Sequence, residues 1–158
     1  MSQHHTAIQW QRTPYALDEK TYSRNHVAVL NGQQSVNVSA SVEFKGDPLC
    51  ADPEQLLISA VSSCHMLTFL AIAEFQGYRV EGYEDRAVGY LEAVQGEGRS
   101  ITRIELSPKI TFGGDKLPDE AALNRMHAGA HKNCFVAKSL KTAVTVVSQT
   151  PQPIDVQA

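Results

Sequence analysis

The stretch ADPEQLLISAVSSCHMLTFLAIAEF, residues 51–75, decides the fold of this chain, because a strong helix start leads directly into an apolar run. Asp52 can cap a helix, and Pro53 suits the first helical position. Gln55 stands three residues after Asp52, as in a capping box. Three independent signals therefore predict that a helix begins here.

The predicted helix should run to about Phe75 and stop at Gly77. Residues 56–73 are apolar nearly all round, which is typical of a helix surrounded by protein. The alternative is a membrane span, but His65, Glu74 and several hydroxyl side chains interrupt a run that would need about 20 apolar residues. We expect a buried central helix, no membrane span, and a second subunit that covers part of the helix.

Strands are predicted before the helix. Residues 36–44 alternate apolar and polar side chains, the period-two pattern of a half-buried strand. The segment HVAVL, residues 26–30, leads into Asn31-Gly32, a pair that readily adopts the positive φ angles of tight turns. We therefore expect a hairpin. The residues expected on its inward face are Val36, Val38, Ala40, Val42 and Phe44.

Strand patterns return after the helix. Residues 84–94 and 101–112 are joined by a glycine-rich segment at 95–100, which predicts a second hairpin. The residues expected to point inward are Ile104, Leu106, Ile110 and Phe112.

A second helix is predicted over residues 118–133, with Pro118 near its start and two acidic residues favouring its positive end. Cys134 follows in a short helical stretch, residues 131–140, and residues 142–150 predict a final strand.

Composition limits the architecture and the partners. With 158 residues, of which 42% are hydrophobic, the chain should form one domain over residues 1–158, with a loose tail at about 151–158. The net charge of -3 gives no basic stripe for a phosphate backbone, so nucleic acid is not an expected partner. The N-terminus, MSQHHTAIQW, lacks the pattern of a secretory signal, which favours the cytoplasm.

Three cysteines, Cys50, Cys64 and Cys134, are too few for a disulfide framework. Cys64 lies in the apolar helix, where its neighbours should raise the thiol pKa and make it inert. The helix dipole fades within the first turn, and His65 points about 100° away from the thiol. A reactive Cys64 therefore requires a cation from elsewhere in the fold.

A metal site is an alternative for Cys134. His127, His131 and Cys134 would share one face of a continuous helix, and with Cys64 they could make a four-ligand zinc set. No paired Cys-x-x-Cys accompanies them. Cys50, just before the helix start, is interpreted as structural or incidental.

Three segments together resemble the family of osmotically inducible protein C and organic hydroperoxide resistance proteins (OsmC/Ohr). These segments are TYSRNHVAVLNGQQSVNVSAS, GDPLCADPEQLLISAVSSCHMLTFLAIAEFQGY and AHKNCFVAKSLKTAVTV. The strongest motif is DPEQLLISAVSSC, with a second cysteine beside an AH pair near the C-terminus. The resemblance implies an α+β, OsmC-like fold, in which antiparallel sheets wrap around long central helices in an intertwined homodimer.

The resemblance also implies a thiol-dependent peroxidase without bound metal or flavin. Cys64 matches the peroxidatic cysteine, Cys134 the resolving cysteine, Arg24 the arginine beside the thiolate, and Glu54 the carboxylate that orients this arginine. Phe135 stands where many relatives have proline, and the surroundings of Arg24 lack the glycines of the organic hydroperoxide resistance branch. The chain therefore looks like a divergent branch.

The expected chemistry is reduction of alkyl or lipid hydroperoxides through a Cys64 sulfenic acid and a Cys64–Cys134 disulfide. An external dithiol, lipoyl or thioredoxin-like, would reset the enzyme. Glu54 and Cys64 would lie about 15 Å apart along a helix, so the carboxylate that serves a given thiol is expected from the partner chain. The remaining alternatives are a zinc-binding protein and a hydrophobic-ligand-binding redox sensor without turnover.

Overall fold

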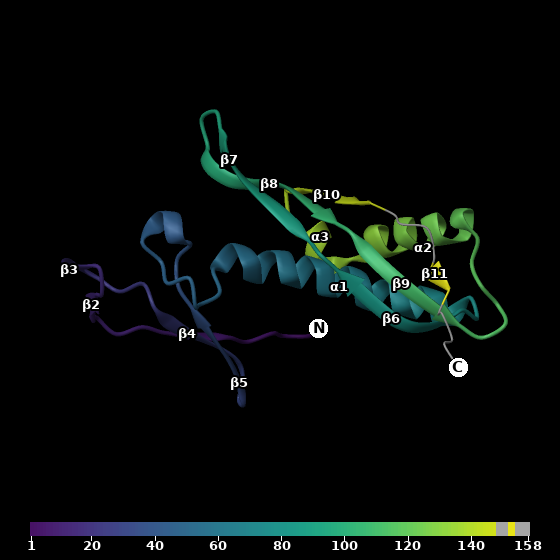
Figure 1. The fold of residues 1–158 in the computed structure, drawn as a ribbon, viewed down its shortest axis with the longest axis horizontal. Helices are drawn as coiled ribbons and strands as arrows, with labels where there is room; N and C mark the ends of the chain where they lie inside the picture. Colours follow the sequence, from purple (N-terminus) through teal and green to yellow (C-terminus); the bar gives the residue numbers. More distant parts are fainter. Residues whose placement is uncertain (148–151, 154–158) are drawn as a thin grey trace. The chain divides into compact units, whose positions relative to one another are not determined.

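The computed structural model describes residues 1–147 and 152–153 and divides the chain into two compact units, Met1–Leu56 and Leu57–Ala158 (Figure 1). Each unit is described by itself. The first unit contains a three-stranded antiparallel sheet with the order β1-β4-β5 and a separate β2–β3 pair. These strands are β1 (Ala7–Gln9), β2 (Pro14–Tyr15), β3 (Asp18–Tyr22), β4 (His26–Asn31) and β5 (Gln34–Val38).

The predicted hairpin before the helix is confirmed as β4 and β5. Its turn does not use the predicted positive φ, because neither Asn31 nor Gly32 adopts that conformation. Instead, the Asn31 side chain accepts hydrogen bonds from the backbone N–H groups of Gln33 (3.2 Å) and Gln34 (3.1 Å). The side chain of Asn31 therefore closes the turn.

The strand predicted over residues 36–44 is wrong beyond Val38. Val42–Phe44 form a 3-10 helix, η1, and the side chains of Val42 and Phe44 are exposed. Buried polar contacts turn the chain at this point: Ser39 Oγ donates to Asn25 Oδ1 (2.9 Å) and accepts from the backbone N–H of Asp47 (3.1 Å). These tertiary contacts override the period-two pattern of the sequence.

The central helix has the predicted bounds, although only one row of its side chains is buried within this chain. α1 spans Pro53–Phe75, and Gly77 follows it with φ 75°. The capping box is present in both directions, because Gln55 N donates to Asp52 Oδ1 (2.7 Å) and Asp52 N donates to Gln55 Oε1 (3.1 Å). By length and composition alone α1 could cross a membrane, a test that the core helix of a soluble protein also passes.

The second unit holds two three-stranded sheets, of order β10-β8-β7 and β11-β9-β6. The predicted hairpin is confirmed in part, as the antiparallel β7–β8 pair; the strand expected over residues 101–112 divides, and β9 pairs with β6 instead. The sheets are mixed and not wholly antiparallel as expected, because β10 lies parallel to β8 and β11 lies parallel to β9. The strands are β6 (Arg79–Asp85), β7 (Val88–Val94), β8 (Gly98–Leu106), β9 (Pro108–Gly113), β10 (Ala143–Val146) and β11 (Gln152–Pro153). The predicted final strand, 142–150, is β10 within the described residues. β11 lies in the predicted loose tail, whose other residues are outside the described ones.

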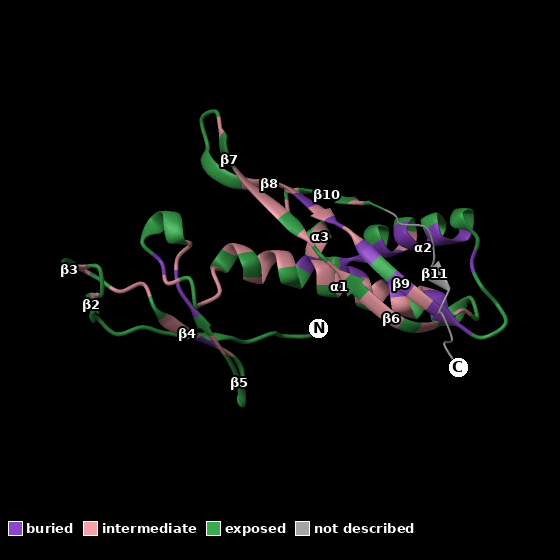
Figure 2. Ribbon diagram, viewed as in Figure 1, coloured by how far each residue is buried: buried purple, intermediate pink, exposed green. Residues whose placement is uncertain are grey.

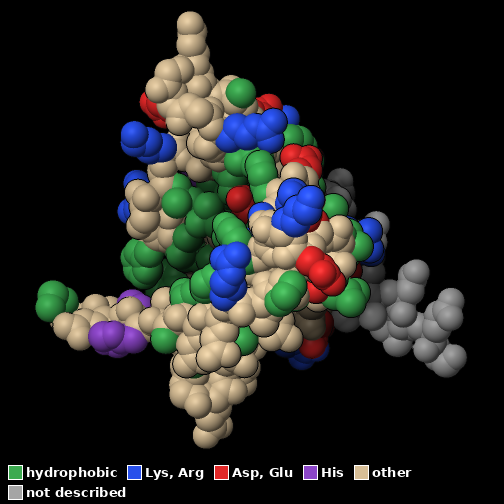
Figure 3. All heavy atoms as spheres, turned by 90° about the vertical axis from the view of Figure 1, so that its left-hand side faces the viewer, with side chains coloured by type: hydrophobic (Ala, Val, Ile, Leu, Met, Phe, Trp, Pro, Cys, Tyr) green, Lys and Arg blue, Asp and Glu red, His purple; other side chains and the backbone are tan. Residues whose placement is uncertain are grey.

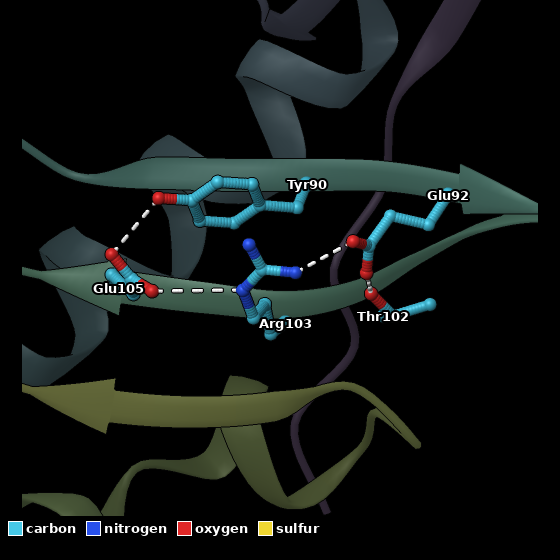
Figure 4. A network of polar contacts seen from close by, with 5 residues as sticks. All are labelled: Tyr90, Glu92, Thr102, Arg103 and Glu105. Carbon is cyan, nitrogen blue, oxygen red and sulfur yellow. Dashed lines mark hydrogen bonds and ion pairs between the residues drawn. The ribbon is translucent and has the colours of Figure 1, made fainter.

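Surface side chains link the two strands of the β7–β8 hairpin (Figure 4). Arg103 lies over the Tyr90 ring, 3.5 Å from its centroid, and pairs with Glu92 (2.7 Å) and Glu105 (3.6 Å). Tyr90 donates to Glu105 (3.0 Å), and Thr102 donates to Glu92. Because the charges are exposed, the network adds little stability. On the face shown in Figure 3, Lys and Arg side chains are scattered and form no continuous stripe.

The four residues predicted to point inward after the helix are all buried. They divide between two core clusters: Ile110 and Phe112 pack with residues of α1 and α2, and Ile104 and Leu106 pack with Val61 of α1. Buried residues accordingly concentrate on β9 and α2 in Figure 2. α1 therefore contributes buried residues to both clusters.

The second predicted helix is α2 (Glu120–Asn133), and its N-cap is Asp119, whose Oδ1 accepts from Ala122 N (2.6 Å). The helix stops at Cys134, whose backbone is extended (φ -70°, ψ 109°), and α3 (Phe135–Lys138) follows. This break is what positions the second cysteine.

Candidate active site

Cys64 lies on α1 beside the row of residues that the helix buries. That row repeats every four residues, so it forms one face of the helix; it consists of Val61, His65, Phe69 and Ala73. Cys64 is half-buried, at the border of this face. Its side chain therefore packs partly against the core and stays partly accessible to solvent.

Cys134 reaches α1 from the break between α2 and α3. Its side chain is 1% exposed. The sulfur accepts a hydrogen bond from Ala137 N (3.4 Å), as the N-cap of α3, and can donate to the carbonyl of Val61 (4.0 Å). Val61 lies almost one turn before Cys64 on α1, so the extended backbone at Cys134 brings the second thiol to the first.

The two thiols interact, and their pKa values move in opposite directions. Burial raises the pKa of Cys64, but hydrogen bonds from the Val136 N–H, the Cys134 thiol, the Phe135 N–H and the Thr68 side chain outweigh burial and lower it overall. Burial and the bond to Cys64 raise the pKa of Cys134. Cys64 is thus the thiol that ionises more readily, and Cys134 is the one that stays protonated.

Hydrogen bonds lower the pKa of Cys64 within the second unit, while the expected contribution of a cation stays a prediction. The donors come from the backbone of α3, namely the N–H groups of Phe135 and Val136. Neither residue is predictable from the sequence, because a backbone N–H carries no side-chain signature. The only available signal was the short helical stretch around Cys134, since the first N–H groups of a helix have no partners within it.

Arg24 belongs to the first unit and Cys64 to the second, so the expected pairing of guanidinium and thiolate stays a prediction. Arg24 donates to the Tyr22 carbonyl and lies over the rings of Tyr22 (4.5 Å) and Tyr15 (5.5 Å). It lines a hollow of about 460 Å³ within the first unit. Glu54 lies in the first turn of α1, and no ion pair between Arg24 and Glu54 occurs in the described part of the chain.

The arrangement behind the zinc alternative does not form. α2 ends before Cys134, so His127, His131 and Cys134 share no continuous helix. His127 is buried and contacts His65, whereas His131 is exposed. Residues 1–147 contain no group of three or more His, Cys, Asp or Glu side chains placed to hold a metal ion.

Cys50 stands apart from the other two cysteines in sequence and in environment. It lies half-buried in the first unit, where burial and the charge of Asp47 raise its pKa. A thiol with a raised pKa is a weak nucleophile at neutral pH. Its interpretation as structural or incidental stays a prediction.

The fold and this pair of thiols define a class: an α+β protein with a half-buried cysteine on a long central helix and a second cysteine at a helix break. The family model for the OsmC-like protein matches residues 44–149, and the chain belongs to that family. The resemblance found in the sequence is therefore confirmed, as is the predicted α+β, OsmC-like fold.

Solved structures and a curated relative agree with this assignment. An OsmC-like protein of unknown function from Vibrio cholerae is 36% identical, with a TM-score of 0.86 over 98% of this chain and 100% of that one. An organic hydroperoxide resistance protein OsmC from Legionella pneumophila is 18% identical, with a TM-score of 0.62 over 92% and 96%. The uncharacterized protein YmaD of Bacillus subtilis is 22% identical over 75% of this chain and 80% of its own. Low identity to the second and third fits a divergent branch.

Proposed function

We propose that the protein is a thiol-dependent peroxidase that reduces organic hydroperoxides. The observation that carries the proposal is the position of the Cys134 sulfur against the helix of Cys64, 4.0 Å from the Val61 carbonyl oxygen. The pKa is lowered at Cys64 and raised at Cys134, which supports it. One sulfur is thereby prepared to attack and the other is kept protonated until it is needed. The family includes proteins named for organic hydroperoxide resistance, which supports the same chemistry.

In the first step, the Cys64 thiolate attacks the distal oxygen of the hydroperoxide. The S–O bond forms as the O–O bond breaks, and the leaving alkoxide takes a proton to become the alcohol. The sulfur is oxidised to sulfenic acid and the peroxide is reduced. The backbone donors Phe135 and Val136 support this step because they stabilise the attacking thiolate.

In the second step, Cys134 attacks the sulfur of the Cys64 sulfenic acid. The S–S bond forms, the S–O bond breaks, and hydroxide leaves as water with the proton of Cys134. An external dithiol, lipoyl or thioredoxin-like, then reduces the disulfide by exchange and is itself oxidised. No cofactor needs to be bound for this cycle.

An organic substrate fits the surroundings of the thiol better than hydrogen peroxide does. Cys64 borders an apolar face of α1, and the exposed side chains of Leu67 and Phe135 extend the apolar surface nearby along the chain. An alkyl chain gains from leaving water for such a surface, whereas hydrogen peroxide loses hydration there.

Arg24, Glu54 and a second subunit complete the proposal. α1 is unbroken from Pro53 to Phe75, so Glu54 and Cys64 of one chain are separated by about 15 Å of helical rise. A homodimer with antiparallel central helices would bring the Glu54 carboxylate of one chain, with Arg24, to the thiol of the other. The exposed Phe75 and Leu67 on α1 support a partner that covers this helix.

The test is peroxide consumption with cumene hydroperoxide and dihydrolipoamide, compared with hydrogen peroxide. We expect Cys64→Ser to abolish the reaction and Cys134→Ser to allow sulfenic acid formation without efficient turnover. Cys50→Ser is the matched control and should keep wild-type turnover. A wild-type rate equal to that of Cys64→Ser would refute the proposal, and a single stoichiometric oxidation without turnover would identify a redox sensor instead.

A further inference from the structure

The buried face of α1 contains a polar residue that the proposed chemistry does not use. His65 follows Cys64 directly, and its side chain is 1% exposed. The rest of its buried row is apolar. A histidine in such a position loses the hydrogen bonds of water and needs a partner inside the protein.

That partner is His127 of α2, itself only 4% exposed. His65 Nε2 and His127 Nδ1 lie 3.1 Å apart, and the rings stack with centroids 5.4 Å apart and planes 13° apart. Burial is the main cause that lowers both pKa values to about 4. His131 adds to the lowering at His65, and His65 adds to it at His127. Both rings are therefore neutral at neutral pH, and one donates to the other.

The described residues satisfy the hydrogen-bonding groups of the pair only in part. His127 Nε2 is buried without a hydrogen-bond partner among the described residues. An unsatisfied buried nitrogen opposes folding, and an apolar ring of similar shape would avoid this cost. Phe69 already packs against His127 with ring centroids 4.6 Å apart, so an aromatic hydrocarbon suits the surroundings.

The pair adds a directional interaction between α1 and α2. Apolar contacts between α1 and α2 are non-directional, and several side chains of both helices supply them. A hydrogen bond has a narrow range of length and angle, and one buried polar pair can select a single register between packed helices. The two elements that this bond joins are the helix that carries Cys64 and the helix that ends at Cys134.

We propose that the His65–His127 hydrogen bond fixes the register between α1 and α2 and thereby holds the Cys134 sulfur where it can resolve a Cys64 sulfenic acid. His65 and His127 are positioning residues, since neither needs to touch the peroxide. The link to sulfenic acid rests on the proposed function. The register itself does not.

The resolving step is the one that should depend on this register. Disulfide formation requires a narrow geometry of both sulfurs and their Cβ atoms. A shift of α2 along α1 would misplace Cys134, and small misplacements cost large factors in rate. The attack of Cys64 on peroxide uses only one of the two sulfurs and should change much less.

The decisive variant is His127→Phe, which keeps the stacked ring but removes both nitrogens. His127→Asn is its matched control, because the amide offers a hydrogen-bonding atom near the position of Nδ1. Two rates are measured after one addition of cumene hydroperoxide: sulfenic acid formation, trapped with dimedone, and appearance of the Cys64–Cys134 disulfide, both by mass spectrometry. Unfolding curves of each variant report stability.

We expect His127→Phe to unfold at the same or higher denaturant concentration than wild type. It should form sulfenic acid within about threefold of the wild-type rate but the disulfide about tenfold more slowly or worse. His127→Asn should recover most of the disulfide rate. Equal disulfide rates in all three proteins would overturn the inference and leave the peroxidase proposal intact.

A second measurement separates the two proposals if wild type does not react with peroxide. The equilibrium between the dithiol and glutathione disulfide gives the effective concentration of one thiol at the other without any peroxide. We expect about a tenfold fall in His127→Phe and recovery in His127→Asn. Equal effective concentrations in wild type and His127→Phe would refute the claim that the histidine pair fixes the register of the two helices. If His127→Phe fails to fold, His65→Phe with His65→Gln as its control makes the same comparison from α1.

Discussion

The backbone N–H of Val136 lowers the pKa of Cys64, with a smaller effect from Phe135, although Val136 and Cys64 belong to different helices. This contact exists because α2 stops at Cys134 and α3 begins immediately afterwards. A thiolate on the central helix thus receives hydrogen bonds from the first residues of another helix.

Phe135→Pro should weaken the Cys64 thiolate, because proline has no N–H. The substitution suits the backbone, since Cys134 is already extended and proline is favoured at a first helical position. Losing a hydrogen bond to a charged group costs about 1.5 kcal/mol or more, so alkylation of Cys64 by iodoacetamide at neutral pH should slow by about tenfold. Phe135→Ala keeps the N–H and should react like wild type. Equal rates in the two variants would exclude the contribution of this donor.

The buried histidines should make the fold acid-sensitive. The pKa of both histidines is about 4 in the folded protein and about 6.5 in the unfolded chain. As pH falls, the unfolded chain therefore takes up these protons before the folded protein does. The free energy of unfolding is therefore fully maintained above about pH 6.5 and is lost progressively toward pH 4. Around His65, the neighbouring His131 lowers the pKa further and Asp85 opposes this shift. Denaturant titrations from pH 7 to 5 measure the slope.

His127→Phe supplies the control for this pH dependence. It removes one of the two titrating rings, so the slope between pH 6 and 5 should fall by about 1.4 kcal/mol per pH unit. An unchanged slope would show that His127 does not titrate with a depressed pKa.

Gly46→Ala should destabilise the first unit strongly. A Cβ at this position would overlap the Ala40 carbonyl oxygen, and backbone atoms cannot move aside as a flexible side chain can. We expect a loss of about 3 kcal/mol or more in the free energy of unfolding. Gly32→Ala is the matched control, because nothing lies within 4 Å of its added Cβ. A loss at Gly46 no larger than that at Gly32 would contradict the close approach.

Asp52→Ala should weaken the start of α1. The carboxylate accepts from Gln55 N at 2.7 Å, and removal of such a cap costs about 1 kcal/mol in the free energy of unfolding. Asp52→Asn keeps a capping oxygen and should lose only a few tenths of this value. Urea unfolding of the three proteins makes the comparison, and equal losses in the two variants would show that the cap contributes little.

The central helix was predictable from residues near one another in sequence. Asp52, Pro53 and Gln55 determine its start, and Gly77 determines its end, because capping depends on local backbone geometry. The buried faces of the later strands followed in the same way, since side chains alternate across a strand. The family resemblance rested on the same local motifs.

The strand expected over residues 36–44 failed for a reason that the sequence does not display. Its apolar alternation is real, but the hydrogen bonds of Ser39 with Asn25 and Asp47 turn the chain after Val38. Those partners lie far enough away in sequence that no period could reveal them.

The sequence by itself determined the central helix, the identity of the two candidate sulfurs and the family of the protein. Only the tertiary structure decided how the Cys64 thiol is stabilised and which residue accompanies His65. The donors Phe135 and Val136 act through backbone N–H groups, and His127 meets His65 across two helices. Both are long-range contacts, which depend on where packed elements meet rather than on the spacing of residues along one of them.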